Sequence, residues 1–152
     1  MKILFIGDSI TDSERNKNDP ADLGDGYVKL LSEKLPPLYE DKTFTFVNRG
    51  ISGNKIGDIA ARLDECLAEK ADIVILLAGI NDVLHKYTEG TIFDSQIFEQ
   101  TYLQVVQKIK ESGTVLIIAE PFLLDVPDKK RMRKDFDMVL AAVKRIEAQY
   151  AD

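Results

Sequence analysis

The chain has 152 residues, of which 45% are hydrophobic and 30% are charged, and its formal net charge is −6. This length and hydrophobic share allow one domain with a buried core, and they exclude the disordered and fibrous classes of protein. The negative charge and the absence of a dense Lys/Arg block argue against nucleic acid or an anionic membrane as a partner. A small neutral or weakly polar substrate fits this composition better.

The single cysteine and the N-terminal apolar run both indicate an ordinary cytoplasmic domain. Cys66 has no second cysteine with which to form an internal disulfide, and it shares the apolar face of a predicted helix with Ile59 and Leu63. We therefore predict a buried core thiol without nucleophilic function. The apolar run at the N-terminus is broken by Asp8, which makes it too short for a secretory signal or a membrane span.

Apolar, β-branched runs alternate along the chain with segments of helical periodicity. The pattern predicts strands over 2–6, 43–48, 72–78 and 114–119, and the third of these is apolar throughout, as in a strand buried on both faces. It predicts helices over 26–35, 57–69, 98–109 and 136–146. The stretch "GINDV" at 79–83 reads as a turn, and the polar segments 13–26 and 86–95 read as insertions within one domain.

Alternating strands and helices predict a parallel sheet covered by helices on both faces, a three-layer α/β/α domain that spans residues 1–152. The predicted elements end on a helix with no returning strand. The fourth strand would then form a long apolar edge of the sheet, which proteins avoid. We infer that a closing strand is missing and that the domain is C-terminally incomplete.

Polar residues follow each of the first three strands, at the rim where the carboxyl ends of parallel strands meet. Because these residues have no evident packing role, we expect them to converge on a site. They are Asp8 and Ser9 after the first strand, Asn48, Ser52, Gly53 and Asn54 after the second, and Asn81 and Asp82 after the third.

Residues of these types can perform acyl transfer, which needs an activated hydroxyl and fixed donors for the developing oxyanion. Ser9 offers a hydroxyl and a backbone N–H, Gly53 a backbone N–H, and Asn81 a side-chain amide. Structural alternatives stay open for each: Ser9 as a helix cap, Gly53 as a residue with positive φ, and Asn81 as a turn residue. Asp8 and Asp82 are interpreted as supporting carboxylates that hold the loops through backbone amides.

Three motifs follow the first three predicted strands in register: "GDSIT" at 7–11, "NRGISGN" at 48–54 and "GIND" at 79–82. They resemble the motifs of the SGNH (GDSL) hydrolases, which are serine esterases and acylhydrolases. The resemblance implies a flavodoxin-like three-layer fold with Ser9 as the nucleophile. It also implies an oxyanion hole made by the N–H groups of Ser9 and Gly53 and the Asn81 side chain. We expect no metal or organic cofactor, because no cluster of His, Cys and carboxylate residues has the spacing of metal ligands.

Further residues resemble the branch that contains bacterial acetylxylan esterases and related carbohydrate acetyl esterases. They are "LGDGYV" at 23–28, "VNRGISGN" at 47–54, and Pro121, Phe122, Met132 and Arg133. The resemblance implies a small-molecule ester substrate from which a short acyl group, above all acetyl, is removed. Members of this branch often assemble, so a homo-oligomer is an open alternative, although no stretch of the sequence identifies an interface.

The sequence departs from the family pattern at the catalytic base. The family supplies its histidine and orienting carboxylate from a C-terminal Asp-x-x-His block, and no such block occurs in residues 1–152. The resemblance therefore implies a base beyond Asp152. The one histidine present, His85, is interpreted as a surface residue near the site, since no carboxylate partner is evident, and its use as a substitute base is the lesser alternative.

A catalytically impaired fragment of an esterase is one alternative function. Two more alternatives belong to other classes of protein. Asp8 and Asp12 would suit a magnesium-dependent phosphoryl-receiver module on the same topology, but that module needs an aspartate after the third strand, where "LLAG" offers none. A nucleotide- or flavin-binding module would need a phosphate-cradling loop, and "GDSIT" has one glycine and no lysine.

Overall fold

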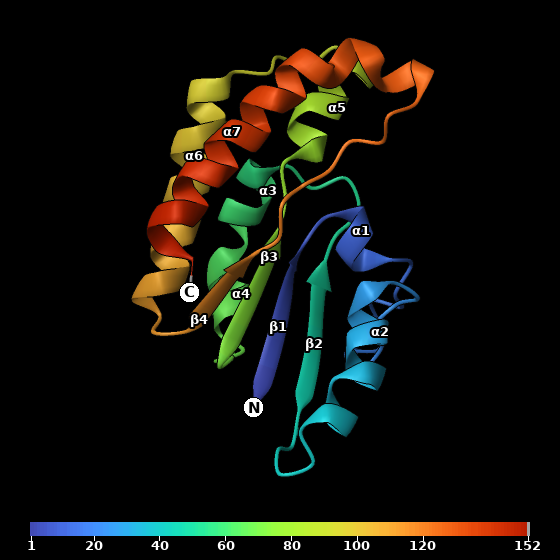
Figure 1. Ribbon diagram of the computed structural model, residues 1–152, viewed down its shortest axis with the longest axis vertical. Helices are drawn as coiled ribbons and strands as arrows, with labels where there is room; N and C mark the ends of the chain where they lie inside the picture. The colour runs from blue at the N-terminus through green and yellow to red at the C-terminus, as the bar shows by residue number, and fades with distance from the viewer. Residues whose placement is uncertain (152) are drawn as a thin grey trace.

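Four parallel strands form the centre of the computed structural model, which describes residues 1–151 (Figure 1). They are β1 (Lys2–Gly7), β2 (Thr45–Gly50), β3 (Ile73–Leu77) and β4 (Val115–Ile118), and their order across the sheet is β2-β1-β3-β4. Gly7 at the end of β1 pairs with Gly50 of β2 and with Leu77 of β3. Three strands therefore end level, and the loops that follow them start side by side.

Seven α-helices connect and cover the strands within the described residues. In chain order they are α1 (Ser9–Asp12), α2 (Tyr27–Lys34), α3 (Ile56–Ala61), α4 (Leu63–Leu67), α5 (Ile80–Thr88), α6 (Ser95–Glu111) and α7 (Arg133–Tyr150), with short 3-10 helices at Pro36–Leu38 (η1) and Pro127–Met132 (η2). The predicted α/β class with a parallel sheet is confirmed.

Three predicted elements differ from the structure. The prediction of a turn at 79–83 was wrong, because Gly79 adopts φ +130° and α5 begins directly after it. The helix expected over 57–69 is divided at Arg62 into α3 and α4. Strand β2 starts and ends two residues later than expected, so it includes Arg49 and Gly50.

The two faces of the sheet are covered unequally. Helices α3, α4, α6 and α7 pack on one face and enclose the larger core, in which Cys66 is buried as predicted. The other face is covered by α2 and the chain around it, mainly over β1 and β2.

The predicted three-layer arrangement is confirmed, but the layer on the α2 side covers β3 and β4 only in part. On the α2 side, Ile73 and Ile75 of β3 are only partly buried. Val115 and Ile117 of β4 are 45% and 41% exposed. A mainly apolar groove of about 360 Å³ lies beside α2 over these strands, and Phe5 and Phe46 are among the residues that line it.

Candidate active site

Ser9 stands at the end of β1, on the exposed first turn of α1. Asp8 precedes it as the N-cap, and its Oδ1 accepts a hydrogen bond from the Ile10 N–H at 3.0 Å. The capping role considered for Ser9 thus belongs to Asp8. Within residues 1–151 neither the Ser9 hydroxyl nor the Ser9 N–H has a hydrogen-bond partner, so both are available to a substrate.

Asp8 is buried beneath Ser9 and holds the turn in place. Burial raises the pKa of this carboxyl, and the hydrogen bond from the Ile10 N–H opposes that rise. Its second oxygen, Oδ2, is buried without a hydrogen-bond partner among the described residues. The carboxyl therefore fixes the conformation of the turn while being too deep to reach a substrate on the rim.

The loop after β2 carries Gly53 with φ +83°, a conformation that glycine adopts without strain. A Cβ built on Gly53 would meet no atom within 4 Å. The Gly53 N–H has no hydrogen-bond partner in the described chain. The loop is fastened to β1, because the Ile51 N–H donates to the Gly7 carbonyl at 3.0 Å. Gly53 thus presents a free N–H beside open space at the same end of the sheet as Ser9.

Asn48 braces the loops from below and does not face the rim, contrary to the sequence prediction. Its buried side chain donates from Nδ2 to the Thr11 carbonyl at 2.6 Å and to the Leu23 carbonyl at 2.8 Å. Its Oδ1 accepts the Gly50 N–H at 2.8 Å. Since every polar atom of this side chain has a protein partner, Asn48 has none left for a substrate.

Asn81 lies in the first turn of α5, where it is only 4% exposed. Its Nδ2 donates to the Asn54 carbonyl at 3.0 Å, which ties the start of α5 to the residue after Gly53. A primary amide carries two N–H donors. One of them is used in this bond, and the second has no hydrogen-bond partner in the described chain.

Asp82 joins the same two loops by a second contact. Its carboxylate accepts the Ile56 N–H at 3.1 and 3.3 Å, at the first residue of α3. Burial raises the pKa of Asp82 to about 7, although the Ile56 N–H and nearby Lys55 act against the rise. Like Asp8, Asp82 holds a backbone amide, as expected of a supporting carboxylate.

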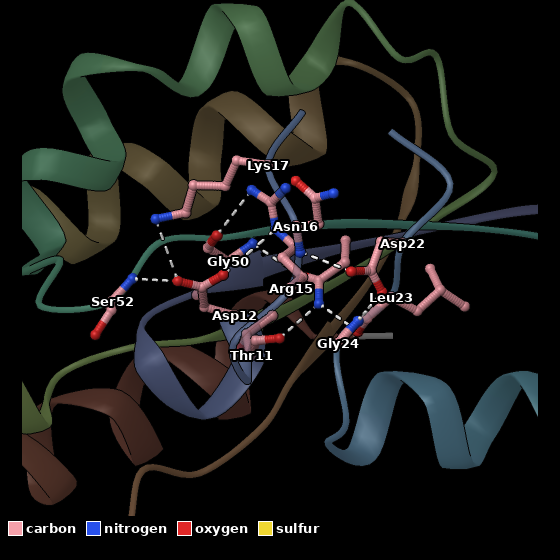
Figure 2. A network of polar contacts seen from close by, with 12 residues as sticks. Thr11, Asp12, Arg15, Asn16, Lys17, Asp22, Leu23, Gly24, Gly50 and Ser52 are labelled. Atoms are coloured by element: carbon pink, nitrogen blue, oxygen red, sulfur yellow. Dashed lines mark hydrogen bonds and ion pairs between the residues drawn. The ribbon is translucent and has the colours of Figure 1, made fainter. Parts of the chain in front are cut away.

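Asp12, Arg15 and Arg62 also hold the rim together, and the sequence analysis did not identify them as part of the site. Asp12 accepts the Ser52 N–H at 3.0 Å and is paired with both Arg15 and Lys17 (Figure 2). The Arg62 guanidinium donates to the Gly7 carbonyl at 3.3 Å and to Asn54 Oδ1 at 2.8 Å. The bond from the Ser52 N–H to Asp12 joins residues 40 positions apart, and that from Arg62 to the Gly7 carbonyl joins residues 55 positions apart. The sole signal for them was the position of Asp12 directly after the "GDSIT" motif.

His85 has a carboxylate partner, contrary to the sequence interpretation. Its Nδ1 lies 3.4 Å from Glu89 Oε2, one turn further along the chain. No hydrogen bond joins His85 to Ser9 within residues 1–151. Ser9 and Ser52 line a shared cavity of about 390 Å³ to which His85 does not contribute.

The site therefore combines an exposed serine hydroxyl with donors from three loops that are fastened to one another.

No cluster of three or more potential metal-ligating side chains occurs in the described part of the chain. None of the helices in residues 1–151 has the length and apolar character needed to cross a membrane.

Comparison with known proteins finds the same combination of motifs and fold. Residues 5–152 match the GDSL-like lipase/acylhydrolase family. An acetylxylan esterase from Geobacillus stearothermophilus is 34% identical over 154 residues, which cover 95% of this chain and 70% of that protein.

Solved structures agree with the sequence comparison. The crystal structure of Axe2, an acetylxylan esterase from Geobacillus stearothermophilus, superposes with a TM-score of 0.89 at 33% identity, over 98% of this chain and 72% of that one. LAE5, an alpha/beta hydrolase from the metagenome of Lake Arreo, Spain, gives a TM-score of 0.89 at 28% identity, over 98% and 73%.

Proposed function

Because the chain belongs to the GDSL-like lipase/acylhydrolase family, and is thus a carboxylic ester hydrolase, we propose that it removes acetyl groups from carbohydrate hydroxyls. The similarity to an acetylxylan esterase, in sequence and in structure, supports this substrate class. The substrate would be a small ester whose acetylated unit is itself neutral, in keeping with the net charge of −6.

We propose that Ser9 is the nucleophile and forms an acyl-enzyme. The observation that carries this proposal is the exposed Ser9 hydroxyl, which has no hydrogen-bond partner among the described residues. Axe2 offers a parallel, since a catalytic mutant of that enzyme replaces a serine by alanine. Attack by the hydroxyl on the acyl carbonyl would release the sugar alcohol, and water would then hydrolyse the acyl-serine.

The oxyanion of each tetrahedral intermediate would rest on three donors: the N–H groups of Ser9 and Gly53 and the second Nδ2–H of Asn81. The two backbone N–H groups have no partner in the described chain, and the Asn81 amide is held by the Asn54 carbonyl. Donors fixed before the reaction stabilise the developing charge without the cost of reorganisation.

We propose that the general base is a histidine outside residues 1–152, in a C-terminal segment that would complete the domain. His85, the one histidine of the chain, is paired with Glu89 and lies outside the cavity that Ser9 lines. Catalytic mutants of Axe2 replace an aspartate and a histidine that are separated by two residues. That spacing is the Asp-x-x-His pattern that the resemblance implied.

Hydrolysis of p-nitrophenyl acetate by the wild-type protein and by Ser9→Ala tests the nucleophile. We expect the substitution to lower kcat by about 10³-fold or more, since it removes the attacking atom. Ser32→Ala is the matched control, because Ser32 lies on α2 and its hydroxyl bonds only the Lys29 carbonyl. Equal rates for wild type and Ser9→Ala would overturn the proposal.

His85→Ala tests the position of the base. We expect this variant to keep the wild-type rate, because the His85 side chain contacts Glu89 and not the serine. A loss as large as that of Ser9→Ala would assign the base to His85 and contradict a base outside residues 1–152.

A further inference from the structure

A cavity of about 380 Å³ beside the rim is lined by an unusual number of cationic side chains. We call it the cationic cavity. Its lining residues are Arg15, Lys17, Pro20, Arg49, Ile51, Arg62, Glu65 and Cys66. Half of them are Arg or Lys, in a chain whose net charge is −6.

The carboxylates around the cationic cavity leave one of its four cations without an ionic partner. Asp12 is shared by Arg15 and Lys17, and Glu69 pairs with Arg49. Within residues 1–151 no carboxylate pairs with Arg62, whose N–H groups donate to the neutral atoms Asn54 Oδ1, Cys66 Sγ and the Gly7 carbonyl. Glu65 on the wall and Asp22 near Arg15 do not change this, so the cavity offers an anion a guanidinium group that no carboxylate neutralises.

The Arg15 side chain is largely enclosed by its neighbours. It is 7% exposed, and its buried Nε has no hydrogen-bond acceptor in the described chain, although Asp12 Oδ1 lies 3.5 Å away. Burial lowers the pKa of the Arg15 guanidinium, Asp12 opposes that shift, and the charges of Arg49 and Arg62 add to it. Repulsion among neighbouring guanidinium groups is relieved when an anion binds between them.

Asp12 connects the cationic cavity with the Ser9 cavity. Asp12 and Ser52 line the Ser9 cavity, whereas Lys17 lines the cationic cavity. Figure 2 shows Lys17 and the Ser52 N–H both reaching Oδ2 of Asp12. A ligand long enough to extend past Asp12 would reach both cavities, as a chain of sugar units can.

We propose that the cationic cavity binds the carboxylate of an acidic sugar unit that neighbours the acetylated one. This inference rests on the proposed function, and it makes acetylated oligosaccharides with a uronic acid unit the preferred substrates. Guanidinium groups pair with carboxylates through two parallel hydrogen bonds, which suits a single carboxylate. A polyanion would instead be repelled by the net negative charge of the rest of the chain.

The test measures binding on the Ser9→Ala protein, so that it does not depend on turnover. Calorimetric titration at low salt uses D-glucuronate, the neutral sugar D-xylose and inorganic phosphate as probes. We expect glucuronate to bind, xylose to bind at least tenfold more weakly, and phosphate to bind more weakly than glucuronate. Lys17→Gln removes one positive charge from the cationic cavity. The Lys17 side chain is 54% exposed, so it can be replaced without disturbing the core. We expect this variant to bind glucuronate about tenfold more weakly.

Lys144→Gln is the matched control, because Lys144 lies on α7 and pairs with Glu120, and neither residue lines the cationic cavity or the Ser9 cavity. We expect its affinity for glucuronate to equal that of the parent. Absence of glucuronate binding, or equal loss in Lys17→Gln and Lys144→Gln, would overturn the proposal. Phosphate binding as tight as that of glucuronate would overturn the assignment to an acidic sugar.

The failure of this inference and that of the proposed function give different results. If Ser9-dependent hydrolysis is found but glucuronate does not bind, the cationic cavity has no such role and the esterase function stands. If glucuronate binds and Lys17→Gln weakens it while no Ser9-dependent hydrolysis is found, the anion site stands and the proposed function fails.

Discussion

At the scale of single residues, the sequence predicts some residues of the candidate site and misses others. Ser9, Gly53 and Asn81 were identified because each lies in a short motif after a predicted strand. Arg15 and Arg62 were not, because a long guanidinium side chain reaches partners up to 55 positions away and leaves no local pattern. Asn48 was placed wrongly for a related reason, since the pattern marks it as polar without saying that it points into the protein.

Asn81→Ala tests the third oxyanion donor. We expect kcat to fall about 10²- to 10³-fold with little change in KM, because the amide would stabilise the transition state and not the bound ester. The measurement is steady-state hydrolysis of p-nitrophenyl acetate, with circular dichroism to verify folding. Asn18→Ala, in the exposed segment before α2, serves as the control. A change confined to KM would contradict an oxyanion role.

Asp82 makes stability depend on pH. Its pKa is raised to about 7 in the folded state from an ordinary value of 3.8, so between these values the folded chain holds more protons than the unfolded chain. The contribution of Asp82 to the free energy of unfolding is therefore largest below about pH 4 and is lost as the pH rises toward 7.

Asp82→Asn should remove this dependence while keeping an oxygen for the Ile56 N–H. The measurement is urea unfolding at pH 5 and at pH 7.5. Over this interval we expect the free energy of unfolding of the wild type to fall by about 2 kcal/mol more than that of the variant. This is less than the full pKa shift of Asp82 implies, because Asp82 is partly exposed. The difference between the two proteins isolates Asp82 from the other carboxyl groups. Identical pH profiles would contradict the raised pKa.

At the scale of the elements, the strands and long helices follow from periodicity, whereas the short helices around the site do not. Residues 79–83 were predicted to form a turn, yet Gly79 is the N-cap of α5 and the next four residues are its first helical turn. The division between α3 and α4 coincides with Arg62, whose guanidinium reaches three different segments. Local sequence patterns do not predict the secondary structure near the site, because tertiary contacts determine the backbone conformation there.

The packing of α1 on β2 depends on Gly50. A Cβ at this position would lie 2.2 Å from the Asp12 N and 2.6 Å from the Thr11 carbonyl carbon, both backbone atoms that cannot rotate away. We expect Gly50→Ala to reduce the free energy of unfolding by about 3 kcal/mol, measured by urea unfolding. Gly57→Ala on α3 is the control, because its Cβ would meet nothing within 4 Å and alanine favours helices by about 1 kcal/mol. Equal effects would refute the close contact.

At the scale of the whole molecule, the fold class and the parallel sheet were predictable because strand and helix alternate. The unequal cover of the two faces was not, since an apolar strand such as β3 looks the same in sequence whether one or both of its faces are covered. In the structure its side chains alternate between buried and partly buried.

The open α2-side face should bind hydrophobic dyes. We expect 8-anilinonaphthalene-1-sulfonate to fluoresce with the wild-type chain, and Ile117→Lys to lower the signal by about half because it puts a charge in the apolar groove. Ile92→Lys makes the same change at an exposed residue that does not line this groove, and its signal should equal that of wild type. Equal signals for all three proteins would show that the groove is closed in solution.

At the rim, the residues that hold the loops together differ from the exposed residues that line the Ser9 cavity, and this difference affects how substrate preference can change. The groups that hold the loops, among them Asp12, Asp82 and Arg62, point to backbone atoms and neighbouring loops. Side chains on the wall of the Ser9 cavity, such as Glu14 and Asp25, are exposed and take no part in those bonds. Substitutions of Glu14 and Asp25 can therefore accumulate without breaking those bonds, so that substrate preference can drift through evolution while the reaction itself is inherited unchanged.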